Sequence, residues 1–350
     1  MREILALLVS LLIVLSAGYA FYHVGASRTQ NPSMIGHNGI KNPGNGLITA
    51  SEYQKMLGVG INVDWMTFAR VRHYYFYWRS RGVNVPKYFK EEGFSNVRIR
   101  VGVDVTKNRT ALKQLGEIVN DTLEAGLIPI ITYTAPELRE NPTSEAAQEH
   151  FVEWWKTVAE YFRGYPYILS YDLLIESSGP VKSHPEVLNQ IYSRTIREIR
   201  KIDPYRLVFV TPPYTSSPSN LNDLNVTNDG YTLAEWHIYA SGPKGCTYNG
   251  SYIEKAITSA LNWSRKTGIP TWFGAWRPNC YPKAGEGNGP LCSMEVELNF
   301  SKAMASALSK AGIPYDINSD VHFFDIASLT WYQSQESVLK VILRPRRMER

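Results

Sequence analysis

The stretch Ile168-Leu169-Ser170-Tyr171-Asp172-Leu173-Leu174-Ile175-Glu176-Ser177-Ser178-Gly179 decides how the rest of the sequence is interpreted. It is an apolar run that ends on a carboxylate, Glu176, and is then interrupted by Ser-Ser-Gly-Pro. This pattern predicts a buried strand with Glu176 at its C-terminal tip and a helix on either side. A (β/α)8 barrel presents a catalytic acid in this way, although a carboxylate at a strand end can also simply cap the following turn.

Working outward from this strand, the sequence alternates between strand and helix signals. Apolar segments that predict further strands lie at Gly58–Val63, Asn96–Val101, Ile128–Tyr133, Leu207–Val210, Leu233–Tyr239, Ile269–Trp276 and Tyr315–Phe324. Helices are predicted between them, at Val85–Glu92, Ala111–Ala125, Ser144–Phe162, Pro185–Lys201, Tyr252–Lys266, Met294–Lys310 and Ser334–Leu343. Eight βα units in succession predict an α/β fold, a closed (β/α)8 TIM barrel rather than an open sheet.

The N-terminus is predicted to be a targeting segment. An apolar run over residues 4–15 is followed by small residues at Gly18 and Ala20, which is typical of a signal peptide and its cleavage site. If the run extends through Tyr22, it is nearly long enough to span a bilayer, so an uncleaved membrane anchor stays open. The predicted organisation is a signal peptide or N-terminal membrane anchor at 1–26, a linker at 27–46 and the barrel at 47–350.

Either alternative places the folded part outside the cytoplasm, extracellular or at the cell surface, with possible membrane attachment through the N-terminal segment. Asn-x-Ser/Thr sequons agree with export and lie at Asn108, Asn120, Asn225, Asn249, Asn262 and Asn299. The three cysteines, Cys246, Cys280 and Cys292, lie in loops where an exported protein can keep one disulfide. Their spacing does not match a zinc site, so we predict no metal and no cofactor.

Charge and motifs argue against several other functions. The chain has 37 Lys and Arg against 32 Asp and Glu, without a basic stripe interleaved with aromatic residues, so we predict no nucleic-acid partner. It also lacks a Gly-rich phosphate loop, a His-Glu-x-x-His motif and a Gly-x-Ser-x-Gly elbow. The nine Trp and 22 Tyr suit a surface that binds sugars, although most are expected to be core residues.

The order of these motifs resembles that of the family 5 glycoside hydrolases, the cellulase-like branch of a retaining clan built on (β/α)8 barrels. Segments that are similar to family motifs lie at Leu57–Asn62, Phe89–Ile99, Gly126–Ile131, Tyr165–Glu176 and Trp236–Tyr239. The resemblance implies an exported glycoside hydrolase that acts on a polysaccharide or oligosaccharide. It also implies that Glu176 is the acid/base, that Arg98 lies under the nucleophile, and that His237 and Tyr239 belong to the site.

The sequence also departs from the family pattern. Ala275 stands where the family has its strand-7 glutamate nucleophile, and Ile175 stands where it has the Asn that binds the sugar 2-hydroxyl. An alanine cannot attack an anomeric carbon, so standard double displacement is in doubt. Carboxylates that could substitute are Glu235, Asp316 and Asp320, and also Asp64, just after the first strand. For Glu235, a buried pair with Arg98 or Arg100 is the competing interpretation.

Aromatic residues at or beyond strand ends are candidates for stacking on sugar rings, although about half are expected to be packing residues. They are Trp65, Tyr133, Tyr239, Trp276 and Trp331. Three functions stay open: a glycoside hydrolase with Glu176 as proton donor and an unusual second carboxylate, a glycan-binding pseudoenzyme of the same fold, and a structural envelope protein that only inherited the fold.

Overall fold

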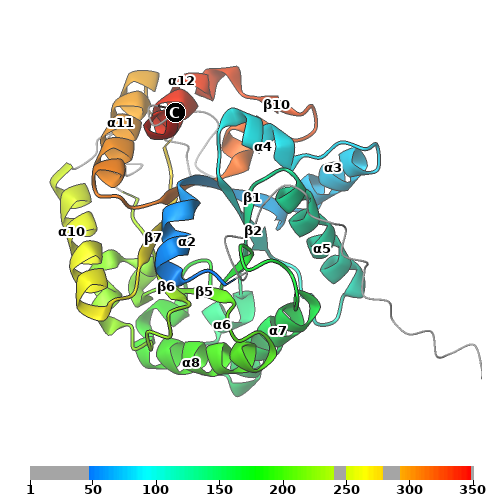
Figure 1. Ribbon diagram of the computed structural model, residues 1–350, viewed down its shortest axis with the longest axis vertical. Coiled ribbons are helices and arrows are strands. Elements are labelled where there is room, and N and C mark those ends of the chain that lie inside the picture. Colours follow the sequence, from blue (N-terminus) through cyan, green and yellow to red (C-terminus); the bar gives the residue numbers. More distant parts are fainter. Residues whose placement is uncertain (1–46, 240–249, 279–291, 348–350) are drawn as a thin grey trace, which may run out of the picture. The chain divides into compact units, whose positions relative to one another are not determined.

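The computed structural model describes residues 47–239, 250–278 and 292–347. Eight parallel strands close into a barrel in sequence order, which confirms the predicted (β/α)8 fold (Figure 1). The strands are β1 (Val59–Met66), β2 (Asn96–Val101), β3 (Ile128–Tyr133), β4 (Ser170–Asp172), β5 (Leu207–Val210), β6 (Thr232–His237), β7 (Thr271–Trp276) and β8 (Tyr315–Asn318).

The helices surround the barrel (Figure 1). The longer ones are α3 (Ala69–Arg79), α4 (Pro86–Glu92), α5 (Arg109–Glu124), α7 (Glu145–Tyr161), α8 (Pro185–Ile202), α10 (Gly250–Thr267), α11 (Met294–Lys310) and α12 (Glu336–Arg347). Short elements in the connections are α6 (Pro136–Glu140), η1 (Pro180–Ser183), α9 (Pro213–Ser216), η2 (Pro218–Asp223), η3 (Asp320–His322), β9 (Phe324–Asp325), β10 (Thr330–Trp331) and η4 (Gln333–Gln335). Side-chain N-caps begin three of the long helices, from Asn108, Ser144 and Ser293.

The helix α2 (Ala50–Leu57) lies across the N-terminal end of the barrel (Figure 1). The Tyr53 hydroxyl donates to the Ile168 carbonyl at 3.0 Å, and Gln54 Nε2 donates to the Thr271 carbonyl at 2.6 Å, both just before or at the start of strands. A capping box between Thr49 and Glu52 begins the helix. This end of the barrel is therefore covered, and the opposite end is left for a site.

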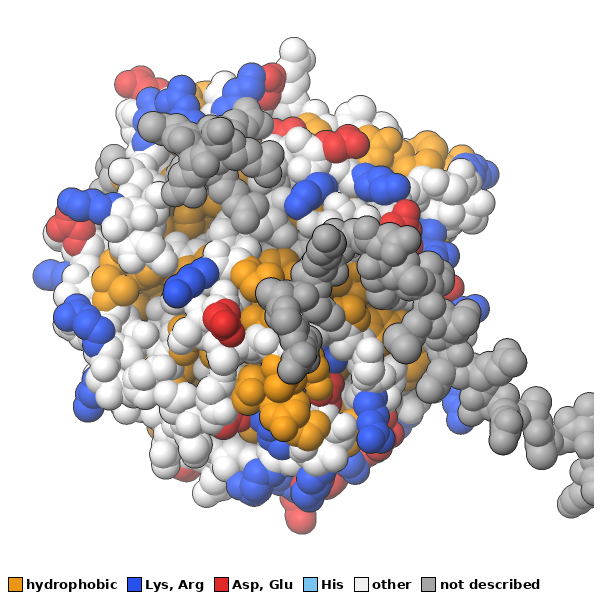
Figure 2. Space-filling view, viewed as in Figure 1, with side chains coloured by type: hydrophobic (Ala, Val, Ile, Leu, Met, Phe, Trp, Pro, Cys, Tyr) orange, Lys and Arg blue, Asp and Glu red, His pale blue; other side chains and the backbone are white. Residues whose placement is uncertain are grey.

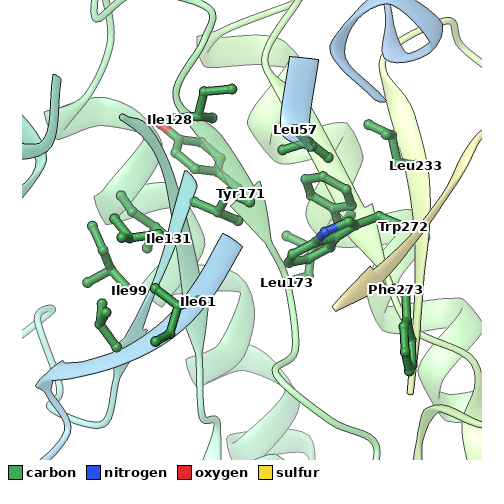
Figure 3. Packing of buried hydrophobic residues seen from close by; sticks show 14 of the residues in the cluster. Leu57, Ile61, Ile99, Ile128, Ile131, Tyr171, Leu173, Leu233, Trp272 and Phe273 are labelled. Atoms are coloured by element: carbon green, nitrogen blue, oxygen red, sulfur yellow. The ribbon is translucent and has the colours of Figure 1, made fainter. Parts of the chain in front are cut away.

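Because side chains alternate along each strand, one set faces the inside of the barrel and the other packs against the surrounding helices. Figure 3 shows Ile61, Ile99 and Ile131 from adjacent strands grouped together, and Leu57 of α2 near Trp272. Ile99 and Ile131 are register partners and pack outside the strands, under the helices. Several inward-facing positions carry polar side chains that are fully buried or nearly so: Asn62, Arg98, Asp172, Glu235 and Asp316. Inside the barrel these polar side chains lie beside aromatic ones, since Arg98 lies over the Trp272 ring and Trp272 packs against Phe209.

Some predicted boundaries were wrong. The strand expected to reach Glu176 ends at Asp172, although Leu173 and Ile175 still donate to the backbone of neighbouring strands. The strand expected to run from Tyr315 to Phe324 ends at Asn318, where η3 follows a bend. The prediction missed α3, because its aromatic-rich sequence has no side-chain cap at Phe68 to mark a helix start.

On the face that Figure 2 shows, Lys and Arg side chains of the described residues are spread around the periphery among acidic ones. None of the helices in the described ranges is long and apolar enough to cross a membrane. Cys292 is disulfide-bonded. Cys246, Cys280 and the predicted signal or anchor and linker at 1–46 lie outside the described residues.

Gly60→Ala tests how tightly the N-terminal end of the barrel is packed. An added Cβ would lie 2.2 Å from Asn96 Oδ1, so the Asn96 side chain would have to move and lose its 3.0 Å hydrogen bond to the Leu57 carbonyl. Urea denaturation should show a loss of about 2–4 kcal/mol in the free energy of unfolding. Gly250→Ala should cause no loss, because beyond its own helix and chain neighbours the added Cβ meets no atom of the described residues within 4 Å. Equal stability of the two variants would contradict this account.

Candidate active site

A cleft of about 260 Å³ opens at the C-terminal end of the barrel, opposite α2. It is lined by residues at or beyond the ends of the strands, which is where (β/α)8 barrels carry their sites. The lining residues are Asn62, Asp64, Thr67, Phe68, Arg98, Arg100, Thr134, Arg139, Ile175, Glu176, His237, Tyr239, Ala275 and Asn318. The cleft thus brings together Glu176, Arg98, His237 and Tyr239, the four residues predicted as catalytic, and it also includes Ala275.

The floor of the cleft is organised by the Arg98 guanidinium, which is fully buried. Its Nε donates to Asp172 Oδ2 at 2.7 Å, and its Nη1 lies 3.3 Å from Glu235 Oε1. Nη2 also donates to the Ile175 carbonyl at 2.9 Å, which fixes the backbone immediately before Glu176. One cation therefore neutralises two buried carboxylates and positions the segment that carries Glu176.

His237 lies between two carboxylates. Its Nε2 forms an ion pair with Glu235, and its Nδ1 lies 3.5 Å from Glu176 Oε1. Burial alone would lower the pKa of His237, and the Arg98 charge acts in the same direction. Attraction to Glu235 and hydrogen bonds to Glu176 and Glu235 outweigh both and raise that pKa to about 9. At neutral pH the imidazole is therefore positively charged.

Of the two carboxylates that contact His237, Glu176 is more accessible than Glu235, with 29% of its side chain exposed. Burial raises its pKa, but the hydrogen bond and positive charge of His237 lower it more, with smaller contributions from Ser178 and Arg139. The net result is a pKa below the ordinary value, so Glu176 is ionised at neutral pH.

A second carboxylate, Asp64, lines the cleft at the end of β1. It forms an ion pair with Arg100, and it accepts a hydrogen bond from Ser319 Oγ at 3.1 Å. Arg100 Nη1 also donates to Asn318 Oδ1 at 2.9 Å, and Asn318 Nδ2 donates to the Tyr239 hydroxyl at 3.2 Å. This network connects the ends of β1, β2, β6 and β8 along one wall of the cleft.

The other proposed substitute carboxylates do not line the cleft. Asp316 is the register partner of Gly60 and lies deeper in the barrel, where burial raises its pKa well above the ordinary value. Asp320 follows β8 and accepts from the Asp64 backbone N–H at 3.1 Å. Burial is the largest cause, and repulsion from Asp64 the second, of a rise in the pKa of Asp320 to about 8. Glu235 is fully buried beneath His237.

Four aromatic residues expected at the mouth are placed elsewhere. Trp65, Tyr133 and Trp276 are buried, and none of them lines the cleft. Each follows a residue that points into the barrel or the cleft, so strand alternation turns its own side chain outward. The ring contacts are Trp65 with Phe89, Tyr133 with Trp154, Trp276 with Phe300, and Trp331 with Phe94.

The aromatic side chains that do line the cleft are Tyr239 and Phe68. Phe68, Arg139 and Asn318 were not predicted. Phe68 and Arg139 lie in connections whose course the strand pattern does not determine, and Asn318 is a neutral side chain at the end of β8. Among the described residues, no group of three or more His, Cys, Asp or Glu side chains is arranged to hold a metal ion.

Barrel glycoside hydrolases carry their catalytic carboxylates at the C-terminal mouth, where Glu176 lies in this chain. More specifically, the chain belongs to the cellulase family, glycosyl hydrolase family 5, whose family model matches residues 62–280. The position of Ala275 in the cleft is where the resemblance to this family places the second carboxylate.

Individual relatives are more distant. Endoglucanase H of Acetivibrio thermocellus is 24% identical over 210 residues, which are 55% of this chain and 23% of that protein. The chain therefore spans about a quarter of that relative's length.

Among solved structures, endoglucanase Cel5A of Thermotoga maritima has a TM-score of 0.68 and 20% identity over 84% of this chain and all of its own. Cellulose synthase subunit Z of Clostridioides difficile has a TM-score of 0.65 and 18% identity over 82% of this chain and 99% of its own. At these identities the likeness shows the fold.

Arg98→Met tests the floor of the cleft. The substitution leaves Asp172 and Glu235 buried without their shared cation, so the free energy of unfolding should fall by about 3–5 kcal/mol. Arg194→Met, which removes an exposed pair with Glu149, should cost at most about 1 kcal/mol. Urea denaturation of both variants measures these free energies. If Arg98→Met loses no more free energy of unfolding than Arg194→Met, the ion pairs of Arg98 do not stabilise the barrel.

Proposed function

We propose that this protein is an exported glycoside hydrolase that binds a polysaccharide or oligosaccharide in the cleft and cleaves its O-glycosidic bonds. Glu176 is the acid/base. The observation that carries the proposal is the position of Glu176, an accessible carboxylate at the mouth of a family 5 barrel. Arg98 fixes the backbone just before Glu176, and the Glu176 side chain faces His237.

The mechanism we propose differs from double displacement through a covalent intermediate. That route needs a second carboxylate about 5–5.5 Å from the first, and Ala275 supplies none. Of the described residues that line the cleft, Asp64 and Glu176 carry carboxylates. Hydrolysis therefore proceeds by single displacement with inversion, in which Asp64 accepts a proton from the attacking water and Glu176 gives a proton to the leaving group.

A second function, saccharide binding without cleavage, is favoured by two observations. Glu176 is ionised at neutral pH, whereas a general acid has to carry a proton. Asp64 is held by Arg100 and Ser319, which restrains it as a base. Binding of gluco- or manno-oligosaccharides without any product would establish this function instead.

The proposal includes export, which rests on the apolar run at residues 4–15 and the small residues that follow it. Protein recovered from its natural host should be found outside the cytoplasm, either without its first residues or attached to the membrane. Recovery of the intact chain in the cytoplasmic fraction would contradict this part of the proposal.

Glu176→Gln tests the acid/base. The amide keeps the shape of the side chain but cannot transfer a proton, so hydrolysis of glucan or mannan should fall by about two to four decades. Because the Glu176 pKa is below its ordinary value, Glu176 is mostly ionised between pH 7 and pH 5, and its small protonated fraction grows as the pH falls. The wild-type kcat/KM should therefore rise by up to about tenfold per unit between pH 7 and pH 5, and the residual rate of the variant should not follow it. A wild-type rate that falls over this range would instead make Glu176 a base.

Ala275→Glu tests the missing nucleophile. It places a carboxylate near Glu176, where like-charge repulsion raises the Glu176 pKa and favours its protonated form. Activity on glucan or mannan should rise, and the anomeric product should change from inverted to retained, as followed by NMR of the first turnover products. Ala275→Gln, which matches the size without the charge, is the control. If both variants bind saccharide and neither gains activity, our placement of the nucleophile position is wrong.

A further inference from the structure

Glu235 is a buried carboxylate that the proposed reaction does not use directly. It lies on β6 and is fully buried below the cleft, 3.3 Å from Arg98 Nη1 and in an ion pair with His237 Nε2. Burying a carboxylate is costly unless neighbouring charges stabilise it, so a role for this charge has to be sought in the groups it contacts.

Glu235 fits inside the barrel because the neighbouring residue on β7, Gly274, has no side chain. A Cβ on Gly274 would lie 1.9 Å from Glu235 Oε1, so this carboxylate occupies the space beside the glycine of β7. The Gly274 carbonyl accepts from Asn62 Nδ2 at 2.9 Å and from Arg98 Nη1 at 3.3 Å, which fixes the backbone there. Glu235 therefore lies beneath the segment that ends with Ala275.

His237 connects this buried carboxylate to the cleft. Its Nε2 contacts Glu235 and its Nδ1 faces Glu176 at 3.5 Å, so both ring nitrogens face carboxylates. Both contacts are satisfied when both nitrogens carry protons, which is the imidazolium form.

We propose that Glu235 is a positioning residue that acts on Glu176 through His237. The buried carboxylate fixes the imidazole as a cation with Nδ1–H directed at Glu176, and so sets the protonation state of the carboxylate that meets the saccharide. The inference deepens the proposed function of the same cleft, but the contacts it rests on exist without substrate and do not require hydrolysis.

Other charged groups face this pair from several strands. Arg98 of β2 lies 3.4 Å from His237 Nε2 and opposes its protonation. Asp172 of β4 and Asp316 of β8 are influenced by the charge of Glu235, as is the Tyr192 hydroxyl of α8. Asp172 keeps Arg98 paired when Glu235 is neutralised, so removal of the Glu235 charge affects His237 most directly.

The test is the titration of His237 in the full chain, followed by NMR of ¹⁵N-labelled histidine and assigned with His237→Asn. In the wild type, both ring nitrogens should stay protonated at neutral pH, with a midpoint near 9. Glu235→Gln should move this midpoint down toward the ordinary value of about 6.5. Glu235→Asp, which keeps the charge, should restore a raised midpoint.

Glu297→Gln is the matched control, because Glu297 is a buried glutamate on α11 outside the contacts of His237. It should leave the His237 midpoint unchanged, whereas a general loss of packing would move it in both variants. A neutral His237 in the wild type at pH 7 would overturn the proposal even if Glu235→Gln does not fold, and so would a folded Glu235→Gln with an unchanged midpoint. Because the titration needs no substrate, its outcome is independent of whether the protein hydrolyses glycans.

In an active enzyme, Glu235→Gln should also move the alkaline limb of the kcat/KM profile, which follows deprotonation of Glu176, toward higher pH, because Glu176 loses a cationic neighbour. A merely structural role would lower activity without moving this limb.

Discussion

The ion pairs of Arg98 inside the barrel are the interaction on which the rest of the site depends. A buried guanidinium is tolerated only with partners, and here it has Asp172 on β4, Glu235 on β6 and carbonyl groups of the β4 and β7 segments. These contacts reach across the barrel, so they fix strands that are not neighbours in the sheet. They also place paired charges inside the barrel, and Arg98 itself forms part of the floor of the cleft.

This arrangement gives each carboxylate near the mouth a different environment. Asp172 and Glu235 are buried beside Arg98, whereas Asp64 lines the cleft in an ion pair with Arg100. Asp320 is kept largely protonated at neutral pH by burial and by its neighbour Asp64. Of the two carboxylates among the described residues that line the cleft, Glu176 is the exposed one, and its contact with His237 lowers its pKa. Burial and neighbouring charges in the barrel, rather than the number of acidic residues, therefore determine which carboxylate is exposed and ionised at the mouth.

The sequence was sufficient for the fold, because apolar strands and Gly-terminated helices recur at regular spacing from Gly58 to Leu343. It also placed Glu176, His237 and Arg98 in one cleft, since inward positions at strand ends converge. It failed for Trp65, Tyr133 and Trp276, where a shift of one residue along a strand decides between the mouth and the outer packing layer. It also could not find Arg139 or Phe68, because their positions depend on the course of connecting segments.

The relation between Ala275 and Glu235 gives the site its distinctive chemistry. A carboxylate at position 275 would repel Glu176 and help it hold a proton, as a general acid requires. In this chain a carboxylate lies instead behind His237, in the space beside Gly274. From there it stabilises the imidazolium, and the imidazolium stabilises ionised Glu176. Thus a carboxylate on β6 has the opposite effect on Glu176 from one on β7. The protonation of Glu176, on which our proposed choice between cleaving and only binding a saccharide depends, thus follows from which of the two strands carries the charge.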